Sequence, residues 1–195
     1  MKKIAIVGLS PSTRNQIPSD FDIYALPWDA EYASRASKLF EMHDRNLLSL
    51  PGSLREPDYF DRLAEYTQPI YMQKHWADIP TSIAFPLAEL KKTIFNNFHR
   101  KWSGQVDFYN SSPAYMIALA IHEGATTIGL YGIDVLDDSE YAYETPCLEY
   151  LLGYAAGKGI EIITPIGPTA LGKFRGAGIK LGIMEPIYNN RYGYI

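Results

Sequence analysis

The chain has 195 residues, of which 47% are hydrophobic and 21% are charged. Its 15 Gly and 13 Pro residues are near the average share, which excludes a collagen-like or low-complexity protein. Eighteen Lys and Arg residues against 22 Asp and Glu residues give a net charge of -4. Modules that capture the nucleic-acid backbone are usually strongly basic, so this is not the main function we expect. The length predicts a single domain over residues 1–195, whose tail from Gly172 has no assigned structure.

The compartment is predicted from the cysteine count and from the apolar runs. Cys147 is the only cysteine, so an intramolecular disulfide is excluded and a cytoplasmic location is expected. The apolar run near the N-terminus covers about six residues, fewer than the roughly 7–15 of a signal peptide. No run approaches the ~18 apolar residues of a membrane span. We therefore expect a cytoplasmic protein that does not interact with a membrane.

Short apolar runs alternate with helical patterns along the chain. Strands are predicted at residues 3–8, 22–26, 40–43, 69–73, 127–133 and 159–165. Helices are predicted at about residues 30–39, 58–66, 86–95, 113–124 and 144–157, and residues 44–57 are predicted as a loop. Continuous apolar strands are typical of a parallel sheet that is covered on both faces. The alternation therefore predicts an α/β fold with right-handed crossovers.

Ligands of open α/β sheets bind at the carboxyl ends of the strands, and the turn GLSPST follows the first predicted strand. It offers backbone N–H groups from Gly8 onward and the hydroxyls of Ser10, Ser12 and Thr13. Such groups suit an anion or a ribose. The turn is neither a GK[ST] loop nor a GxGxxG motif. A hydroxyl-rich turn without a ligand is the alternative.

Asn110, Ser111 and Ser112 precede the long predicted helix, which has a proline at its first turn. Free N–H groups and the helix dipole favour a phosphate at such a position. Ser or Asn at the start of a helix also acts as a simple cap. Both readings, a phosphate site and a cap, are compatible with this sequence.

Acidic and tyrosine residues follow the strand predicted at 127–133. Asp134 stands where a carboxylate can bind a ribose, a base edge or a metal, or can cap the next turn. Tyr141 and Tyr143 are two residues apart, which in an extended segment places both side chains on one side. They are predicted either to stack on a nucleotide or to pack in the core.

The four histidines differ in their predicted surroundings. His43 stands at a predicted strand end beside Glu41 and is the best candidate for a general base, followed by His75. His122 falls inside a helix and is predicted to be structural, and His99 is predicted to be exposed. There is no HExxH motif and no Cys/His zinc spacing, so no metal site is predicted.

Several stretches resemble known families. GLSPST, DFDIYAL, NSSPAYMIALAIHEGATTIGLYGID, SEYAYE and GIEIITPIGPTAL follow one another in this order. Their order and spacing resemble the Rossmann-like core of bacterial sialyltransferases of the lipooligosaccharide type and of motility-accessory, hydroxymethylpterin-pyrophosphokinase-like proteins. With FEMH and the terminal YGY, the pattern is also similar to small proteins common in bacteriophage genomes. The resemblance implies a single Rossmann-like domain with helices on both faces of its sheet.

The resemblance also implies a position for a nucleotide. The donor nucleotide would lie between residues 8–13 and 111–112, with Asp134, Tyr141 and Tyr143 around its base, ribose or phosphates. This chain departs from the sialyltransferase pattern at two places. Residues 25–28 replace the region where the sialyltransferases have an asparagine, and no histidine lies between residues 134 and 164, where they have their catalytic histidine.

We therefore predict a nucleotide-binding, glycosyltransferase-like enzyme that uses a nucleotide-activated donor. Helix-terminal N–H groups would hold the phosphate of the leaving group. His43 or Glu41 would deprotonate the acceptor hydroxyl, and Asp134 is the third candidate catalytic residue. The acceptor would be a modified base or a glycan, in a bacterial or phage-infected cell.

Three alternatives stay open from the sequence. A non-catalytic protein that sequesters a nucleotide fits the missing histidine. Pyrophosphoryl transfer with Mg²⁺ as a cofactor would need carboxylates near the phosphates, for which Asp134, Asp137 and Asp138 are available. An interaction protein, including a homo-oligomer, fits the many tyrosines.

Overall fold

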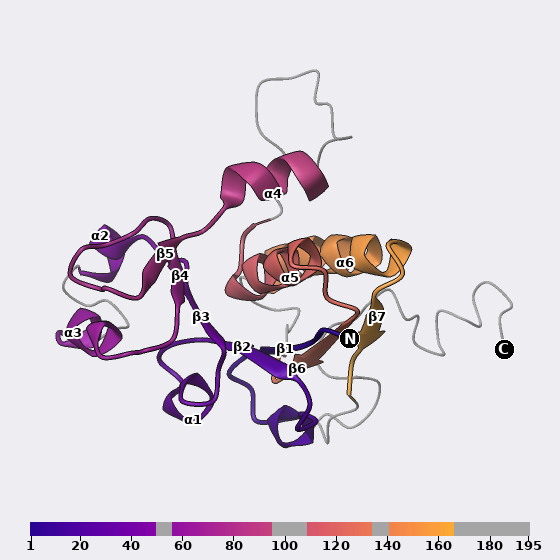
Figure 1. Cartoon of the computed structure of the whole chain (residues 1–195), viewed down its shortest axis with the longest axis horizontal. Helices are drawn as coiled ribbons and strands as arrows, with labels where there is room; N and C mark the ends of the chain where they lie inside the picture. Colours follow the sequence, from indigo (N-terminus) through magenta and orange to yellow (C-terminus); the bar gives the residue numbers. More distant parts are fainter. Residues whose placement is uncertain (50–55, 95–108, 134–140, 166–195) are drawn as a thin grey trace, which may run out of the picture.

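The computed structural model describes residues 1–49, 56–94, 109–133 and 141–165, which form one α/β unit (Figure 1). Its strands make a single seven-stranded sheet in the order β5-β4-β3-β2-β1-β6-β7, and every pair of neighbours is parallel. Helices α4, α5 and α6 lie on one face of this sheet and α1 lies on the other. The predicted Rossmann-like α/β fold is confirmed.

The elements follow the predicted alternation. The strands are β1 Lys3–Val7, β2 Asp22–Ala25, β3 Lys38–Glu41, β4 Ile70–Met72, β5 Ser82–Ala84, β6 Thr127–Tyr131 and β7 Glu161–Ile163. The helices are α1 Ala30–Ala33, α2 Arg45–Leu48, α3 Tyr59–Ala64, α4 Leu87–Ile94, α5 Ser112–His122 and α6 Tyr141–Gly157, with a 3₁₀ turn at Arg14–Gln16. None of the helices in the described ranges is long and apolar enough to cross a membrane.

The core has two layers, one on each face of the sheet. In β1, Ile4 and Ile6 pack among the residues of α4, α5 and α6, whereas Ala5 and Val7 pack among those of α1 and α3. All four are essentially inaccessible to solvent. Because both faces of the strand are covered, its sequence is a continuous apolar run with no alternation.

Two predicted segments were wrong, and one strand was not predicted. The helix predicted at 30–39 ends at Ala33, because the backbone N–H and hydroxyl of Ser37 both donate to the Ile23 carbonyl and lead the chain into β3. The loop predicted at 44–57 contains α2. β5 was missed, because it has only three residues, lies at the sheet edge and leaves Ile83 exposed. A short edge strand of this kind has no apolar pattern to detect.

Candidate functional site

The strand order reverses at β1, because the chain runs from β1 toward β5 on one side and returns as β6 on the other. The loops after β1 and β6 meet at this point. Gly8 N–H donates to the Tyr131 carbonyl over 2.8 Å, and Ser10 N–H donates to the Gly132 carbonyl over 2.9 Å. The Thr13 hydroxyl is buried and accepts the Gly132 N–H over 2.8 Å. These bonds hold the two loops together at the crevice where ligands of such sheets bind.

Two glycines permit this close approach. A Cβ atom on Gly8 would collide with the Gly132 carbonyl oxygen. Gly132 itself has φ of +64°, a conformation that favours glycine, and a Cβ atom there would collide with the Ser10 carbonyl oxygen. The close contact between the two loops therefore requires glycine at both positions.

The loop after β1 leaves fewer N–H and O–H groups for an anion than its sequence predicts. The N–H groups of Gly8 and Ser10 and the hydroxyl of Thr13 are used inside the protein. Ser10 and Ser12 are partly exposed, and their hydroxyls are 3.2 Å apart. The ligand contacts predicted for Ser10 and Ser12 stay predictions.

Arg14 links this loop to the loop after β2, a contact that no local pattern in the sequence indicates. One guanidinium nitrogen binds the Asp29 carboxylate, and another donates to the Leu9 carbonyl over 3.2 Å. The guanidinium also lies 4.2 Å from the centre of the Tyr32 ring. Asp29 directly follows Trp28, a partly buried residue, so this ion pair holds the chain next to the indole.

The start of α5 leaves a buried hydroxyl without a hydrogen bond. Ser111 is the N-cap residue and is 9% exposed. Its carbonyl already accepts the Ala114 N–H over 3.0 Å, and Pro113 has no N–H to offer. The hydroxyl therefore finds no partner among the described residues. A buried polar group left unsatisfied costs about 1–3 kcal/mol, so a ligand or water that completes the bond is favoured.

Aromatic side chains place the start of α5 toward β5. Tyr109 and Tyr115 lie with their ring centres 6.2 and 5.0 Å from the Phe85 ring, which directly follows β5. Phe85 in turn contacts Tyr71 of β4. Ser111 thus lies in the part of the carboxyl edge formed by β3, β4 and β5.

β3 ends in a pairing of a buried carboxylate with an exposed histidine. Glu41 is inaccessible to solvent, whereas the His43 side chain is 50% exposed. One Glu41 oxygen lies 2.6 Å from His43 Nδ1 and accepts the His43 backbone N–H over 3.1 Å, and the other accepts the Tyr59 hydroxyl. With the tautomer that carries its hydrogen on Nδ1, the imidazole donates to Glu41 and leaves Nε2 as the nitrogen that can accept a proton.

This pairing gives the two residues different roles. Because Glu41 is buried and both its oxygens accept hydrogen bonds, it orients His43 and cannot meet an acceptor itself. His43 Nε2 has no hydrogen bond among the described residues, and the ring centre lies 5.8 Å from that of Trp28. An exposed imidazole held through Nδ1 is the arrangement that general-base catalysis uses.

A pocket of about 420 Å³ adjoins this pair between α1 and α3. It is lined by Pro27, Trp28, Ala30, Tyr59, Arg62, Leu63, Glu65 and Tyr66. Trp28 and Tyr59 are shared with the surroundings of His43 and Glu41. The sequence did not point to this pocket, since its walls come from segments that only the fold brings together.

The other predicted site residues lie outside the described ranges or stand at the starts of α5 and α6. Asp134, with the neighbouring Asp137 and Asp138, lies outside the described residues. Tyr141 and Tyr143 stand in the first turn of α6, so the prediction of an extended segment is wrong. The roles predicted for Tyr141 and Tyr143 beside a nucleotide stay predictions. Ser112 is the first residue of α5 and is partly exposed.

The remaining histidines have local roles or fall outside the described ranges. His75 Nδ1 lies 2.9 Å from the Ser82 carbonyl, which is the contact of a loop-fixing residue. His122 is 30% exposed and lies 3.7 Å from the Glu89 carboxylate, in agreement with a structural role. His99 lies outside the described residues. Within the described ranges, no three His, Cys, Asp or Glu residues are grouped to hold a metal.

Sialyltransferases are among the solved structures to which this chain is similar. The chain is similar to the sialyltransferase CstII from Campylobacter jejuni in complex with cytidine-5'-monophosphate, with 17% identity, a TM-score of 0.51 and full coverage of both chains. It is also similar to CST-II in complex with a trisaccharide acceptor and CMP, with 16% identity, a TM-score of 0.50 and 99% of both chains covered. A single-residue variant of alpha-2,3/8-sialyltransferase CstII shares 20% identity and a TM-score of 0.50, over 83% of this chain and 80% of that one.

These likenesses are structural and concern the fold. No protein-family model matches the sequence, and no curated protein matches it either. At identities below a quarter, the neighbours establish a common architecture, in agreement with the sialyltransferase part of the predicted resemblance. The resemblance to bacteriophage proteins and to pyrophosphokinases stays a prediction.

Proposed function

We propose that this protein is a glycosyltransferase-like enzyme that transfers a sugar from a nucleotide-activated donor to an acceptor hydroxyl. The observation that carries the proposal is the imidazole of His43, exposed at the carboxyl edge and held through Nδ1 by buried Glu41. The fold is similar to that of sialyltransferases solved with CMP and with a trisaccharide acceptor. A cytidine nucleotide is therefore the first donor to test.

In the proposed reaction, His43 Nε2 removes the proton of the acceptor hydroxyl while the acceptor oxygen bonds to the anomeric carbon. The bond between that carbon and the donor phosphate breaks, and the nucleotide leaves with the electron pair. Glu41 stabilises the imidazolium that forms, as an orienting carboxylate does in other His-based sites. The Ser111 hydroxyl, unpartnered at the start of α5, is the group we assign to the nucleotide.

The test is turnover of CMP-, UDP- and GDP-linked sugars by the wild-type chain and by His43→Asn. Loss of a general base costs roughly 10²- to 10⁴-fold in rate, and we expect this loss in transfer while nucleotide affinity is kept. His122→Asn is the matched control, because that residue lies at the far end of α5 and should leave the rate unchanged. Equal activity of His43→Asn and wild type would contradict the assignment of the base.

A second candidate is a protein that binds a nucleotide without reacting with it. The absence of any histidine between residues 134 and 164 favours it, since the resembling sialyltransferases have their catalytic histidine in that region. The same incubation separates the two functions. Tight binding of a nucleotide-sugar that is recovered intact after long incubation, with and without Mg²⁺, would support this candidate over the transferase.

A further inference from the structure

The pocket between α1 and α3 combines aromatic walls with a polar rim. Trp28, Tyr59 and Tyr66 supply rings to its lining. The Tyr66 hydroxyl donates to the Pro27 carbonyl over 2.7 Å, and the Tyr59 hydroxyl binds Glu41, so both tyrosines are held in place. Its volume of about 420 Å³ lies within the ~300–1,000 Å³ of small-molecule sites.

The charges on the rim argue against an anionic ligand. Arg62 is half exposed and lies 3.7 Å from the Asp58 carboxylate, one turn earlier on the same helix. Glu65 adds a second carboxylate to the lining itself. The single guanidinium is therefore balanced, and a phosphate or carboxylate would gain little from it. Adjacent donor and acceptor groups above aromatic rings suit a neutral ligand with many hydroxyls.

The pocket also adjoins the proposed base. Its Trp28 wall lies 5.8 Å, between ring centres, from the His43 imidazole, and its Tyr59 wall binds the carboxylate that orients this imidazole. Trp28 is thus a neighbour of both the pocket and the imidazole, and Tyr59 is linked to the imidazole through Glu41. The loop that contains Trp28 is fixed by the Arg14–Asp29 pair, so the wall is rigid before a ligand arrives.

We infer that this pocket binds a neutral sugar unit of the acceptor, with its ring against Trp28 and Tyr66 and its hydroxyls on Arg62 and Glu65. The inference rests on the proposed transfer reaction for its biological meaning. The binding site itself can be tested without any donor. It assigns the acceptor to the pocket between α1 and α3 and keeps the nucleotide at the start of α5, with His43 at the carboxyl edge they share.

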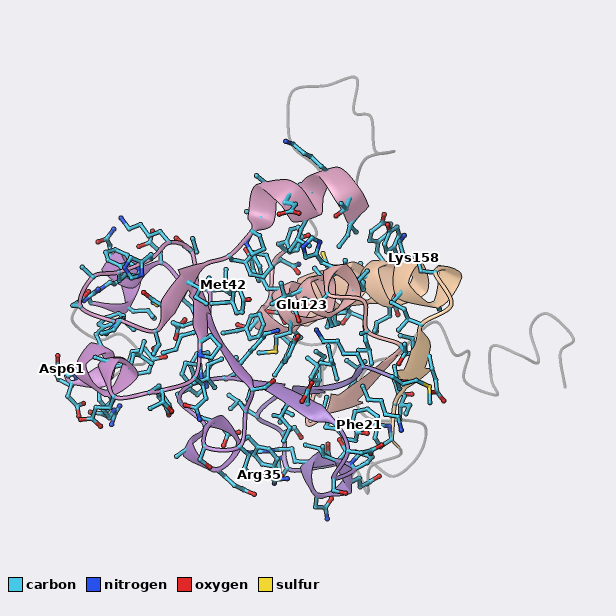
Figure 2. All side chains as sticks on the ribbon, in the orientation of Figure 1. Phe21, Arg35, Met42, Asp61, Glu123 and Lys158 are labelled. Carbon is cyan, nitrogen blue, oxygen red and sulfur yellow. The ribbon has the colours of Figure 1, made fainter. Side chains whose placement is uncertain are left out.

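The experiment is a ligand-observed NMR titration with galactose, N-acetylglucosamine and lactose, on the wild-type chain and on the double variant Arg62→Gln, Glu65→Gln. Each lost hydrogen bond to a hydroxyl weakens binding several-fold, so we expect the double variant to raise the Kd at least about tenfold. Asp61→Asn is the matched control, because Figure 2 labels Asp61 on the outer side of the same helix, where it is exposed. Glucuronic acid should bind more weakly than the neutral sugars.

The outcomes separate this inference from the proposed function. Donor turnover without binding of any neutral sugar, or binding that the double variant leaves unchanged, would overturn the acceptor pocket and leave the transferase standing. Sugar binding that the double variant abolishes, without turnover of any donor, would support the pocket and remove the transferase. Stronger binding of glucuronic acid than of the neutral sugars would contradict the charge argument.

Discussion

The two edges of the sheet differ in how completely their polar groups are paired. At the amino edge, the Glu123 carboxylate at the end of α5 accepts hydrogen bonds of 2.6 Å from Lys2, Lys38 and the Tyr24 hydroxyl. Figure 2 labels Glu123 at α5. At the carboxyl edge, the Ser111 hydroxyl and His43 Nε2 have no such partners among the described residues. The Glu123 network holds the fold, whereas Ser111 and His43 are the groups that we propose for a ligand.

The electrostatics of the amino edge follow from this pairing. Partial burial alone would raise the pKa of Glu123, but the hydrogen bonds from Lys2, Lys38 and Tyr24 outweigh it and lower this pKa to about 2. Burial, together with the neighbouring carboxylate, raises the pKa of Tyr24 well above its usual value. The carboxylate therefore stays ionised in the folded protein at acidity that protonates it in the unfolded chain.

The largest effect is expected on the free energy of unfolding when the Glu123 network at the amino edge is broken. Glu123→Gln leaves two ammonium groups and a buried phenol without their shared carboxylate, and we expect a loss of about 2–4 kcal/mol. Glu65→Gln, which removes an exposed carboxylate, should stay within about 0.5 kcal/mol of wild type. Urea unfolding at pH 7 measures both. Equal losses in the two variants would remove the distinction between paired and unpaired carboxylates.

Acid should weaken the amino edge in a defined direction. Because the folded-state pKa of Glu123 is lowered from 4.5 to about 2, its contribution is present above pH 4.5 and is lost as the pH falls toward 2. A shift of this size corresponds to about 3 kcal/mol. Urea unfolding between pH 6 and pH 2.5 should therefore show a smaller decline for Glu123→Gln than for wild type. Parallel declines would assign the acid sensitivity to other carboxylates.

The smallest effect on stability is expected at the carboxyl edge, for Ser111→Ala. A serine that caps a helix usually loses about 1 kcal/mol on replacement by alanine. Ser111→Ala removes an unsatisfied buried hydroxyl instead, so we expect no loss, or a gain of up to about 1 kcal/mol, together with weaker nucleotide binding. Thermal unfolding with and without CMP measures both. A clear loss of stability would mean that the hydroxyl has a partner in solution.

The parts of the fold that were predictable are those whose sequence follows from burial alone. After their first residues, β1 and β6 have no polar side chain inside the sheet because helices cover both faces, and the N-cap serine and the proline in the first turn mark the start of α5. The boundary between α1 and β3 was missed because it depends on Ser37 reaching β2.

Site residues were predictable only from the rule that ligands of open α/β sheets bind at the carboxyl ends of the strands. That rule selected His43 and Ser111 from their positions after β3 and before α5. The pairing of Glu41 with Tyr59, and the pocket that joins Trp28 to Arg62, depend on contacts between segments far apart in the chain. No local pattern contains such contacts.

The central position of β1 has a consequence for synthesis of the chain. β1 pairs with β2 on one side, but its other neighbour, β6, is made only after residues 127–131 leave the ribosome. Until then an apolar strand has an unpaired edge, which is the feature by which nascent chains associate wrongly. β6 therefore closes the open edge of an apolar strand late in translation, and a chain that stops before β6 would be the form most in need of a chaperone.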